Sequence, residues 1–273
     1  MHMAAQSLVR RSYADPVETY STNVLGTVNV LEACRGTRTV KAVIIVTSDK
    51  CYENREWIWP YRENSRLGGY DPYSSSKACA ELVTGAYRAS FFDSSRRDSA
   101  PLVATVRSGN VIGGGDWAED RLVPDCIRAF VADRSVQLRY PHSIRPWQHV
   151  LDPLAGYLTL AERLLAPDGK TLAGAWNFGP DAGEDATVGE VAEHVGRLWG
   201  DCSVDCSDEP NVFREACLLS LDTTKAMTRL RWRQRWGLNR AIEETVAWYK
   251  AWHNGQDMRA SSLAQIGAYE AEV

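Results

Sequence analysis

The 273-residue chain lacks several features that assign a protein to a class at once. It has no apolar run near the roughly 20 residues that a membrane-spanning helix needs, so we expect no membrane partner. Its first residues show no basic stretch followed by an apolar core, so we expect no signal peptide. With 31 basic and 35 acidic residues the net charge is −4, which predicts no general affinity for nucleic acid. An anionic substrate would therefore need local basic side chains.

The seven cysteines are not arranged for metal or disulfide chemistry. None belongs to a C-x-x-C pair, and Cys202 and Cys206 lack a matching cysteine or histidine pair at zinc-site spacing, so we expect no metal. An odd number of such cysteines is typical of reduced thiols, which predicts a cytoplasmic location.

Short apolar runs alternate with helical patterns through the first part of the chain. Residues 41–46 and 102–107 are runs rich in β-branched residues, and each predicts a strand buried on both faces. Residues 16–35 and 72–92 have helical spacing, and Asp15 is placed to cap the first of these helices. This alternation predicts βαβ units and an α/β fold with a Rossmann-type parallel sheet.

The second part of the chain is more irregular. We expect a partial Rossmann domain over residues 1–112 and a smaller substrate-binding lobe over residues 113–273, with 175–180 returning to the sheet. The pattern predicts further helices and extended segments at 124–133, 136–138, 152–165, 175–178, 188–199 and 242–252.

Tyr73 and Lys77 carry the first chemical signal. Four residues apart on a predicted helix, they share one face and lie about 6 Å apart along its axis. An ammonium beside a phenol favours phenolate, which lets a tyrosine act as a base near neutral pH. The Y-x-x-x-K spacing by itself also occurs by chance on surface helices.

The segment from Thr47 to Lys50 follows the first predicted strand. Ligands of open α/β sheets bind at the carboxyl ends of strands, so hydroxyl groups and an ionisable pair at this edge suit a catalytic site. The alternative for Thr47 and Ser48 is a polar strand end that caps the next turn. The alternative for Asp49 and Lys50 is a solvated charge pair.

Several motifs together resemble the extended short-chain dehydrogenase/reductase family, over essentially the whole chain. They are Ala4-Ala5-Gln6, T-N-V-x-G-T at 22–27, the trio Ser48, Tyr73 and Lys77, R-S-G-N-V-I-G at 107–113 and N-F-G at 177–179. Within that family, four longer stretches resemble the CDP-glucose 4,6-dehydratase branch: DKCYENREWIWPYREN, GGYDPYSSSK, GNVIGGGDWAEDRLVPD and IRPWQHVLDPL.

The resemblance implies a lyase that binds NAD and takes CDP-glucose as its substrate. CDP-D-glucose would become CDP-4-dehydro-6-deoxy-D-glucose plus water, by internal hydride transfer from C4 to C6, in deoxysugar biosynthesis such as that of the lipopolysaccharide O-antigen. A related NAD-dependent nucleotide-sugar epimerase or dehydratase is the alternative within the fold. A simple 4-epimerase has no need of an acid such as Asp49 for departure of the 6-hydroxyl.

The resemblance also implies roles for five catalytic residues. Tyr73 would take the proton of the sugar 4-hydroxyl, and Ser48 would hydrogen-bond the 4-oxygen. Lys77 would hold the nicotinamide ribose, and Asp49 would protonate the departing 6-hydroxyl. Lys50 stands where the dTDP-glucose relatives have glutamate, so it would be either the C5 base or a cation that steadies the enolate.

Further residues are implied as ligand contacts. Those for the cofactor are Ala4, Ala5, Gln6, Asn23, Thr47, Tyr73, Lys77 and Ser108. Those for the substrate are Asn110, Arg145 and Arg214. The guanidinium of Arg145 suits a diphosphate, and the alternative is a structural arginine stacked on Trp147.

The G-x-x-G-x-x-G turn with which family members approach the pyrophosphate is not in this sequence. Gly113-Gly114-Gly115 follows the second predicted strand and is no substitute. By the family pattern about 75 to 80 residues of the first Rossmann strands would precede Met1. We therefore expect weak or no catalysis from the chain as written, and an inactive remnant that binds nucleotide sugar or dimerises is an alternative.

The resemblance finally implies a homodimer. In relatives the helices that correspond to residues 16–35 and 72–92 pair across a two-fold axis as a four-helix bundle.

Overall fold

The structure is a computed structural model that describes residues 1–93, 100–181, 183–206 and 218–272. The chain divides into two compact units. The first unit consists of Met1–Gly109, Leu154–Phe178 and Ser220–Trp232, and the second of Asn110–Pro153, Gly179–Leu219 and Arg233–Val273. Each unit thus contains three segments of the chain. The predicted domains with a single boundary after residue 112 stay a prediction.

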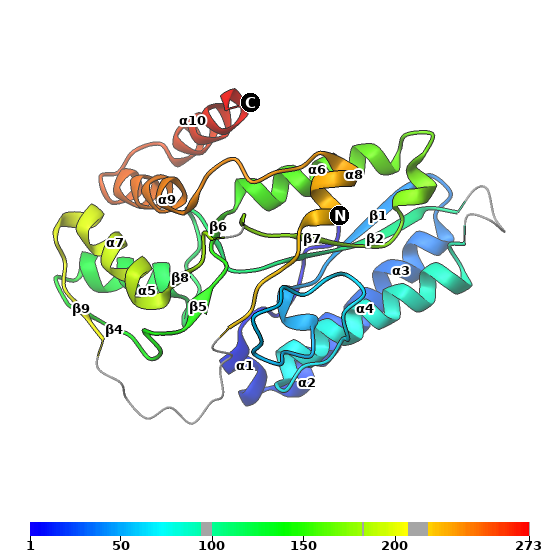
Figure 1. The fold of residues 1–273 in the computed structure, drawn as a ribbon, viewed down its shortest axis with the longest axis horizontal. Coiled ribbons are helices and arrows are strands. Elements are labelled where there is room, and N and C mark those ends of the chain that lie inside the picture. Colours follow the sequence, from blue (N-terminus) through cyan, green and yellow to red (C-terminus); the bar gives the residue numbers. More distant parts are fainter. Residues whose placement is uncertain (94–99, 182, 207–217, 273) are drawn as a thin grey trace. The chain divides into compact units, whose positions relative to one another are not determined.

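A parallel sheet forms the centre of the first unit (Figure 1). Its order is β1-β2-β7, made of β1 (Ala42–Val46), β2 (Leu102–Ser108) and β7 (Ala175–Phe178). His2 lies beside β1, since its N–H donates to the oxygen of Ile44 at 2.8 Å and its oxygen accepts from Val46 at 3.0 Å. The parallel α/β arrangement expected from the sequence is confirmed.

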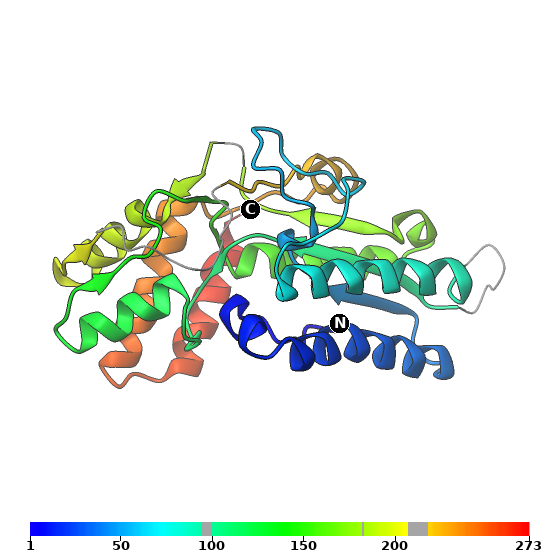
Figure 2. The same ribbon diagram turned by 90° about the horizontal axis from the view of Figure 1, so that it is seen from below.

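The two faces of this sheet are covered by different helices, as Figures 1 and 2 show. Val43 and Ile45 pack with Leu31 of α3 (Gly26–Gly36) and with Val83 of α4 (Pro72–Ser90). Ile44 faces the other way, against side chains of α6 (Leu151–Leu164) and α8 (Thr224–Leu230). Successive strand residues point to opposite faces, which is why an unbroken apolar run was needed here.

The helical stretch before α3 contains a turn of π-helix. It begins with α1 (Val9–Ala14) and α2 (Pro16–Tyr20), and the π-helical turn η1 (Ser21–Leu25) leads directly into α3. Asp15 caps α2, as predicted, by accepting a hydrogen bond of 2.8 Å from the N–H of Glu18. The 3-10 turns of this unit are η2 (Asp49–Cys51) and η3 (Gly169–Leu172).

In its described residues, the second unit is built from helices and three pairs of very short strands. The strand pairs are β3 (Val111–Ile112) with β6 (Gln148–His149), β4 (Val136–Gln137) with β9 (Val204–Asp205) and β5 (Ile144–Arg145) with β8 (Ala186–Thr187). The helices are α5 (Leu122–Val131), α7 (Val188–Gly200), α9 (Leu238–His253) and α10 (Met258–Ala271).

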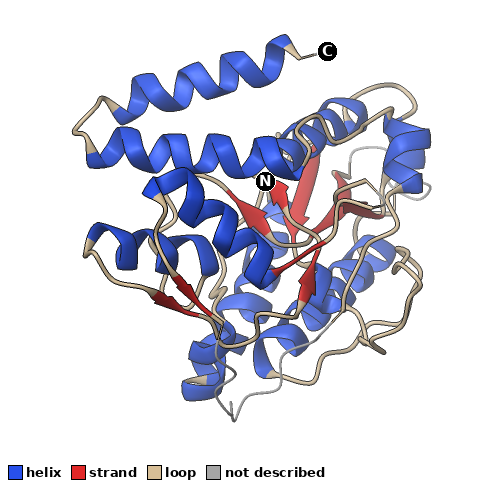
Figure 3. Ribbon diagram, turned by 60° about the vertical axis from the view of Figure 1, so that its left-hand side comes forward, coloured by secondary structure: helices blue, strands red, loops and turns tan. Residues whose placement is uncertain are grey.

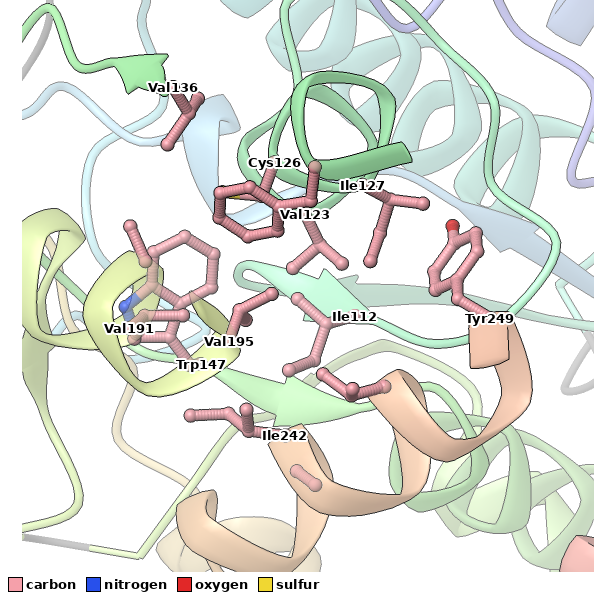
Figure 4. Packing of buried hydrophobic residues seen from close by; sticks show 14 of the residues in the cluster. Ile112, Val123, Cys126, Ile127, Val136, Trp147, Val191, Val195, Ile242 and Tyr249 are labelled. Carbon is pink, nitrogen blue, oxygen red and sulfur yellow. The ribbon is translucent and has the colours of Figure 1, made fainter. Parts of the chain in front are cut away.

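The core of the second unit lies between α5, α7 and α9 (Figure 4). Ile127, Val195 and Ile242 contribute one buried side chain from each of these helices. Helix α10 lies beside α9 at the end of the chain, as Figure 3 shows.

The predicted helices and longer strands are confirmed within a few residues. No sequence pattern predicted α1, α8 or the two-residue strands β3, β5, β6, β8 and β9, because such short segments carry too little periodicity to be recognised. Within the described ranges, no helix combines the length and apolar character that a membrane crossing requires.

Candidate active site

Ser48 and Asp49 form a tight polar turn directly after β1. The Ser48 hydroxyl donates to Oδ1 of Asp49 at 2.9 Å and accepts from the N–H of Lys50 at 3.2 Å. A hydroxyl can do both at once, so one side chain orients the carboxylate and caps the turn η2. Ser48 and Asp49 are buried and Lys50 is half-buried.

Tyr73 and Lys77 lie in the first two turns of α4, and both are buried. The Lys77 ammonium donates to the oxygen of Val46, the last residue of β1, at 3.3 Å. Lys77 is therefore at the carboxyl end of the strand. Burial lowers the pKa of Lys77 to about 8, because a charged amine is costly to remove from water.

The N-terminal segment supports the start of α4. The Ser12 hydroxyl accepts a hydrogen bond of 3.1 Å from the N–H of Tyr73 and donates to the oxygen of Val9 at 2.6 Å. The Asn23 amide donates to the Ser76 hydroxyl at 2.8 Å and to the oxygen of Gln6 at 2.9 Å. The segment that contains the expected cofactor contacts is thus tied to the helix that carries Tyr73.

A buried ion pair lies under this site. Glu81 is one turn after Lys77 on α4, and its carboxylate binds the Arg107 guanidinium through Nε at 2.8 Å and through a terminal nitrogen at 2.7 Å. It also accepts hydrogen bonds from the hydroxyls of Thr47 and Thr105. The hydroxyl of Thr47, expected to contact the cofactor, is therefore engaged in supporting the strand end.

Ser108, at the end of β2, is paired with a tyrosine that the sequence did not suggest. Its hydroxyl lies 2.6 Å from the hydroxyl of Tyr157. Burial raises the pKa of Tyr157 to about 12, and the negative charge of Asp49 acts in the same direction. Asp49 is thus close enough to interact with the pair.

Asn110 and Arg145, the expected substrate contacts, lie in the second unit with Trp147. The oxygen of Asn110 accepts from the N–H of Gln148 at 3.0 Å, which places it beside the segment that follows Arg145. Arg145 is buried, and one of its terminal nitrogens donates to the oxygen of Ile144 at 3.0 Å. The indole of Trp147 belongs to the hydrophobic core and donates to the oxygen of Ala186 at 3.1 Å.

The other residues expected to bind a ligand are Ala4, Ala5 and Arg214. Ala4 is exposed and Ala5 is half-buried. Arg214 lies outside the described residues. Within the described ranges, no group of three or more histidine, cysteine or acidic side chains could hold a metal ion.

The sequence reasoning missed Ser12, Glu81 and Tyr157. Glu81 had a signal, because it follows Lys77 by four residues and so shares a helix face with it. Ser12 and Tyr157 had none, since their partners are 61 and 49 residues away along the chain.

Comparison with protein families and curated proteins gives a consistent result. A family model described as GDP-mannose 4,6 dehydratase matches residues 1–245. The CDP-glucose 4,6-dehydratase of Salmonella typhimurium is 51% identical over 269 residues, covering 98% of this chain and 75% of that protein.

Solved structures share the fold. The dTDP-glucose 4,6-dehydratase of Streptomyces venezuelae, solved as a double mutant with NAD, gives a TM-score of 0.77 at 23% identity over 93% of this chain and 74% of that one. The UDP-glucuronic acid 4-epimerase of Bacillus cereus, solved with UDP-glucuronic acid and NAD, gives 0.78 at 18% identity over 92% and 74%. The Rossmann-type fold class expected from the sequence is confirmed.

Proposed function

Since the chain belongs to the GDP-mannose 4,6 dehydratase family, we propose that it is a nucleotide-sugar 4,6-dehydratase that converts CDP-D-glucose into CDP-4-dehydro-6-deoxy-D-glucose and water. The observation that carries this proposal is the buried Ser48–Asp49 turn at the same strand end as Tyr73 and Lys77. The 51% identity with a CDP-glucose 4,6-dehydratase supports the choice of nucleotide.

The residues at this strand end fit an NAD cofactor. Lys77 and Tyr73 would hold its nicotinamide ribose, and Ala4 and Ala5 would approach it from the neighbouring segment. The Lys77 ammonium donates to the oxygen of Val46, and the N–H of Val46 donates to the oxygen of His2 at 3.0 Å, so the ammonium lies near the N-terminal segment. Burial and the charge of Lys77 both lower the pKa of His2. When bound, NAD supplies reversible hydride acceptance.

Asn23, Thr47, Gln6 and Ser108 would complete the cofactor site mainly as supports. The first three make their described side-chain hydrogen bonds within the protein. A bond from each to the cofactor would have to be added to these contacts or replace one of them. We therefore assign them to fixing the shape of the site.

Tyr73, Ser48 and Lys77 would act on the sugar 4-hydroxyl. Tyr73 would take its proton, with the Lys77 ammonium favouring the phenolate. Ser48 would hydrogen-bond the 4-oxygen as its charge changes, for which the Ser48 hydroxyl proton would turn from Oδ1 of Asp49 to the sugar. The resulting 4-ketone makes the proton on C5 acidic, which prepares the loss of water.

Asp49 and Lys50 would act on C5 and C6. Asp49 would give a proton to the departing 6-hydroxyl, and its bond to Ser48 keeps the carboxyl oriented for this step. Lys50 would either remove the C5 proton or, as a cation, steady the enolate that forms when another base removes that proton.

Asn110, Arg145 and Arg214 would bind the substrate. Arg145 would use its planar guanidinium on the diphosphate, which it can contact through two parallel hydrogen bonds. The pairing of β5 with β8 fixes the backbone of Arg145 for that purpose.

The proposal is tested by incubating the chain with NAD and CDP-, dTDP-, GDP- or UDP-glucose in parallel. The expected result is that the alkali-absorbing 4-keto product, even at a weak overall rate, forms from CDP-glucose well above the rate with the other three. A product from another nucleotide would identify a related dehydratase. Calorimetry that finds CDP-glucose binding without NAD binding would favour a non-catalytic nucleotide-sugar binder.

We also propose a homodimer formed by the helical stretch 16–36 and α4. Large apolar side chains are exposed on both, namely Val17, Leu25 and Leu82 at 76%, 57% and 61%. Light scattering after gel filtration tests this, and Leu82→Glu should give monomers. Among the described residues no two cysteines are joined by a disulfide, which supports a cytoplasmic location. The similarity to a CDP-glucose 4,6-dehydratase supports a role in deoxysugar biosynthesis such as that of O-antigen.

A further inference from the structure

Tyr269 anchors the C-terminal helix α10 to the second unit. Among the described residues of α10, Tyr269 is the one with a buried side chain, and only 4% of its surface is exposed. Its hydroxyl donates to Oδ1 of Asp152 at 2.8 Å. A helix that is otherwise half-exposed or exposed therefore places one aromatic side chain deep in the unit.

Asp152 is the receiving group, and none of its surface is exposed. The same carboxylate oxygen accepts a hydrogen bond of 2.8 Å from the N–H of Arg235. Burial raises the pKa of Asp152 and also that of Tyr269. A phenol that donates to a buried carboxylate forms a charge-assisted bond, and a buried carboxylate that loses such a donor is costly.

A row of aromatic rings in contact leads from Tyr269 to β6. The ring of Tyr269 meets Trp236 edge-on with centroids 5.2 Å apart, and Trp236 lies 4.7 Å from the ring of His149. Burial lowers the pKa of His149 to about 4, so its imidazole is neutral at physiological pH. His149 thus serves as a packed ring whose place depends on the rings beside it.

The same residues lie next to the proposed substrate contacts. His149 belongs to β6, which pairs with β3 directly after Asn110. Arg145 is only four residues before His149, and Asp152 is three residues after it. Tyr269 consequently holds both a ring neighbour of β6 and the carboxylate that follows β6.

We propose that Tyr269 is a positioning residue, through which helix α10 holds the 145–152 segment in place and thereby sets the affinity for the nucleotide sugar. The first half of this statement stands on the contacts above, and the second half rests on the proposed function. Tyr269 acts through Asp152 and Trp236 and has no assigned contact with substrate.

Two other contacts hold α10 on α9, so the role of the Tyr269 hydroxyl can be tested without undocking the helix. The Trp248 indole donates to the Ser262 hydroxyl at 3.0 Å, and the Gln265 amide donates to the oxygen of Glu244 at 2.6 Å. Arg235 also lies over the Tyr269 ring, 5.0 Å from its centroid. Helix α10 should therefore stay docked on α9 in Tyr269→Phe, which keeps the ring and removes only the hydroxyl.

The test compares Tyr269→Phe and Tyr269→Ala with Leu263→Gln, a control on the same helix whose side chain is 55% exposed. Hydrogen exchange reports on the amides of Gln148 and Val150. The N–H of Val150 donates to the oxygen of Ile112 in β3, and that of Gln148 donates to the oxygen of Asn110 just before β3. Calorimetry with CDP-glucose reports on affinity, and circular dichroism verifies that each variant is folded.

We expect Tyr269→Phe to speed exchange at these amides roughly tenfold and to weaken CDP-glucose binding by a similar factor, with a larger effect in Tyr269→Ala. Leu263→Gln should match the wild type in both. Unchanged exchange in both tyrosine variants would overturn the proposal, and so would faster exchange with unchanged affinity. If the wild type does not bind CDP-glucose, the proposed function fails, while the exchange result still decides whether Tyr269 positions the segment.

Discussion

Arg107 and Glu81 form an ion pair of 2.7 Å in which each side chain is only 3% exposed. The pair connects β2 to α4, one turn away from Lys77. The hydroxyl of Tyr52 receives a further hydrogen bond of 2.6 Å from Arg107, and the Thr47 hydroxyl binds the same carboxylate as Arg107. Residues on either side of the proposed catalytic turn are thus held by one buried charge pair.

Loss of this pair should destabilise the protein strongly. Glu81→Ala leaves the Arg107 guanidinium buried without its carboxylate, and we expect the free energy of unfolding to fall by about 3–5 kcal/mol. Urea denaturation measures it. Glu18→Ala removes a matched but exposed pair with Arg11, whose side chains are 56% and 38% exposed, and should cost under about 1 kcal/mol. Equal losses in the two variants would contradict the structural role of the buried pair.

Lys77 should make stability depend on pH in the alkaline range. Its folded pKa of about 8 is below the roughly 10.5 of an unfolded lysine. Between these values the unfolded chain holds more protons, so the contribution of Lys77 to stability rises with pH and its burial cost is fully present below pH 8. Relative to Lys77→Met, the wild type should gain up to about 3 kcal/mol between pH 7.5 and 10.5.

The same substitution should abolish catalysis while leaving the protein folded. Lys77→Met keeps the length of the side chain but removes the ammonium, so kcat should fall by roughly 10²–10⁴-fold at pH 7.5. Thermal melts at that pH should show no loss of stability. An active Lys77→Met enzyme would remove Lys77 from the proposed site.

Ser12→Ala should loosen the first turn of α4. The N–H of Tyr73 would lose its described acceptor, and we expect about 1–2 kcal/mol of destabilisation. Exchange of the Tyr73 amide should quicken more than that of amides late in the same helix. Ser21→Ala is a suitable control, since the Ser21 hydroxyl is exposed and its described hydrogen bonds go to the oxygens of Val17 and Glu18, one turn before it. Equal effects of the two variants on Tyr73 would refute the support by Ser12.

Lys50 can be assigned by a pair of substitutions. If the ammonium steadies the enolate, Lys50→Arg should retain part of the activity and Lys50→Met should lose roughly 10²-fold or more. If it removes the C5 proton, both variants should lose activity alike, because a guanidinium does not give up its proton. Mass spectrometry then follows the exchange of the C5 hydrogen with solvent deuterium in Lys50→Arg. Exchange that is lost assigns proton removal to Lys50, and exchange that persists assigns Lys50 to the enolate.

The sequence by itself determined the local features of this protein. The apolar run Ala42–Val46 predicted a buried parallel strand, the cap at Asp15 began a helix where expected, and the four-residue spacing placed Tyr73 and Lys77 on one face of α4. Such features depend on neighbours a few residues apart, which is the range over which strand and helix periods act. Long motifs also indicated the family that the comparisons then showed.

Only the tertiary structure decided what supports these residues. Glu81 reaches Thr47 across 34 positions, Ser12 reaches Tyr73 across 61, and Tyr269 reaches Asp152 across 117. No local period connects such pairs, because each depends on how whole strands and helices pack. The short strands β3 and β6 place Asn110 beside the 145–152 segment. They are stabilised by pairing with each other and by core contacts, so no local sequence pattern predicts them.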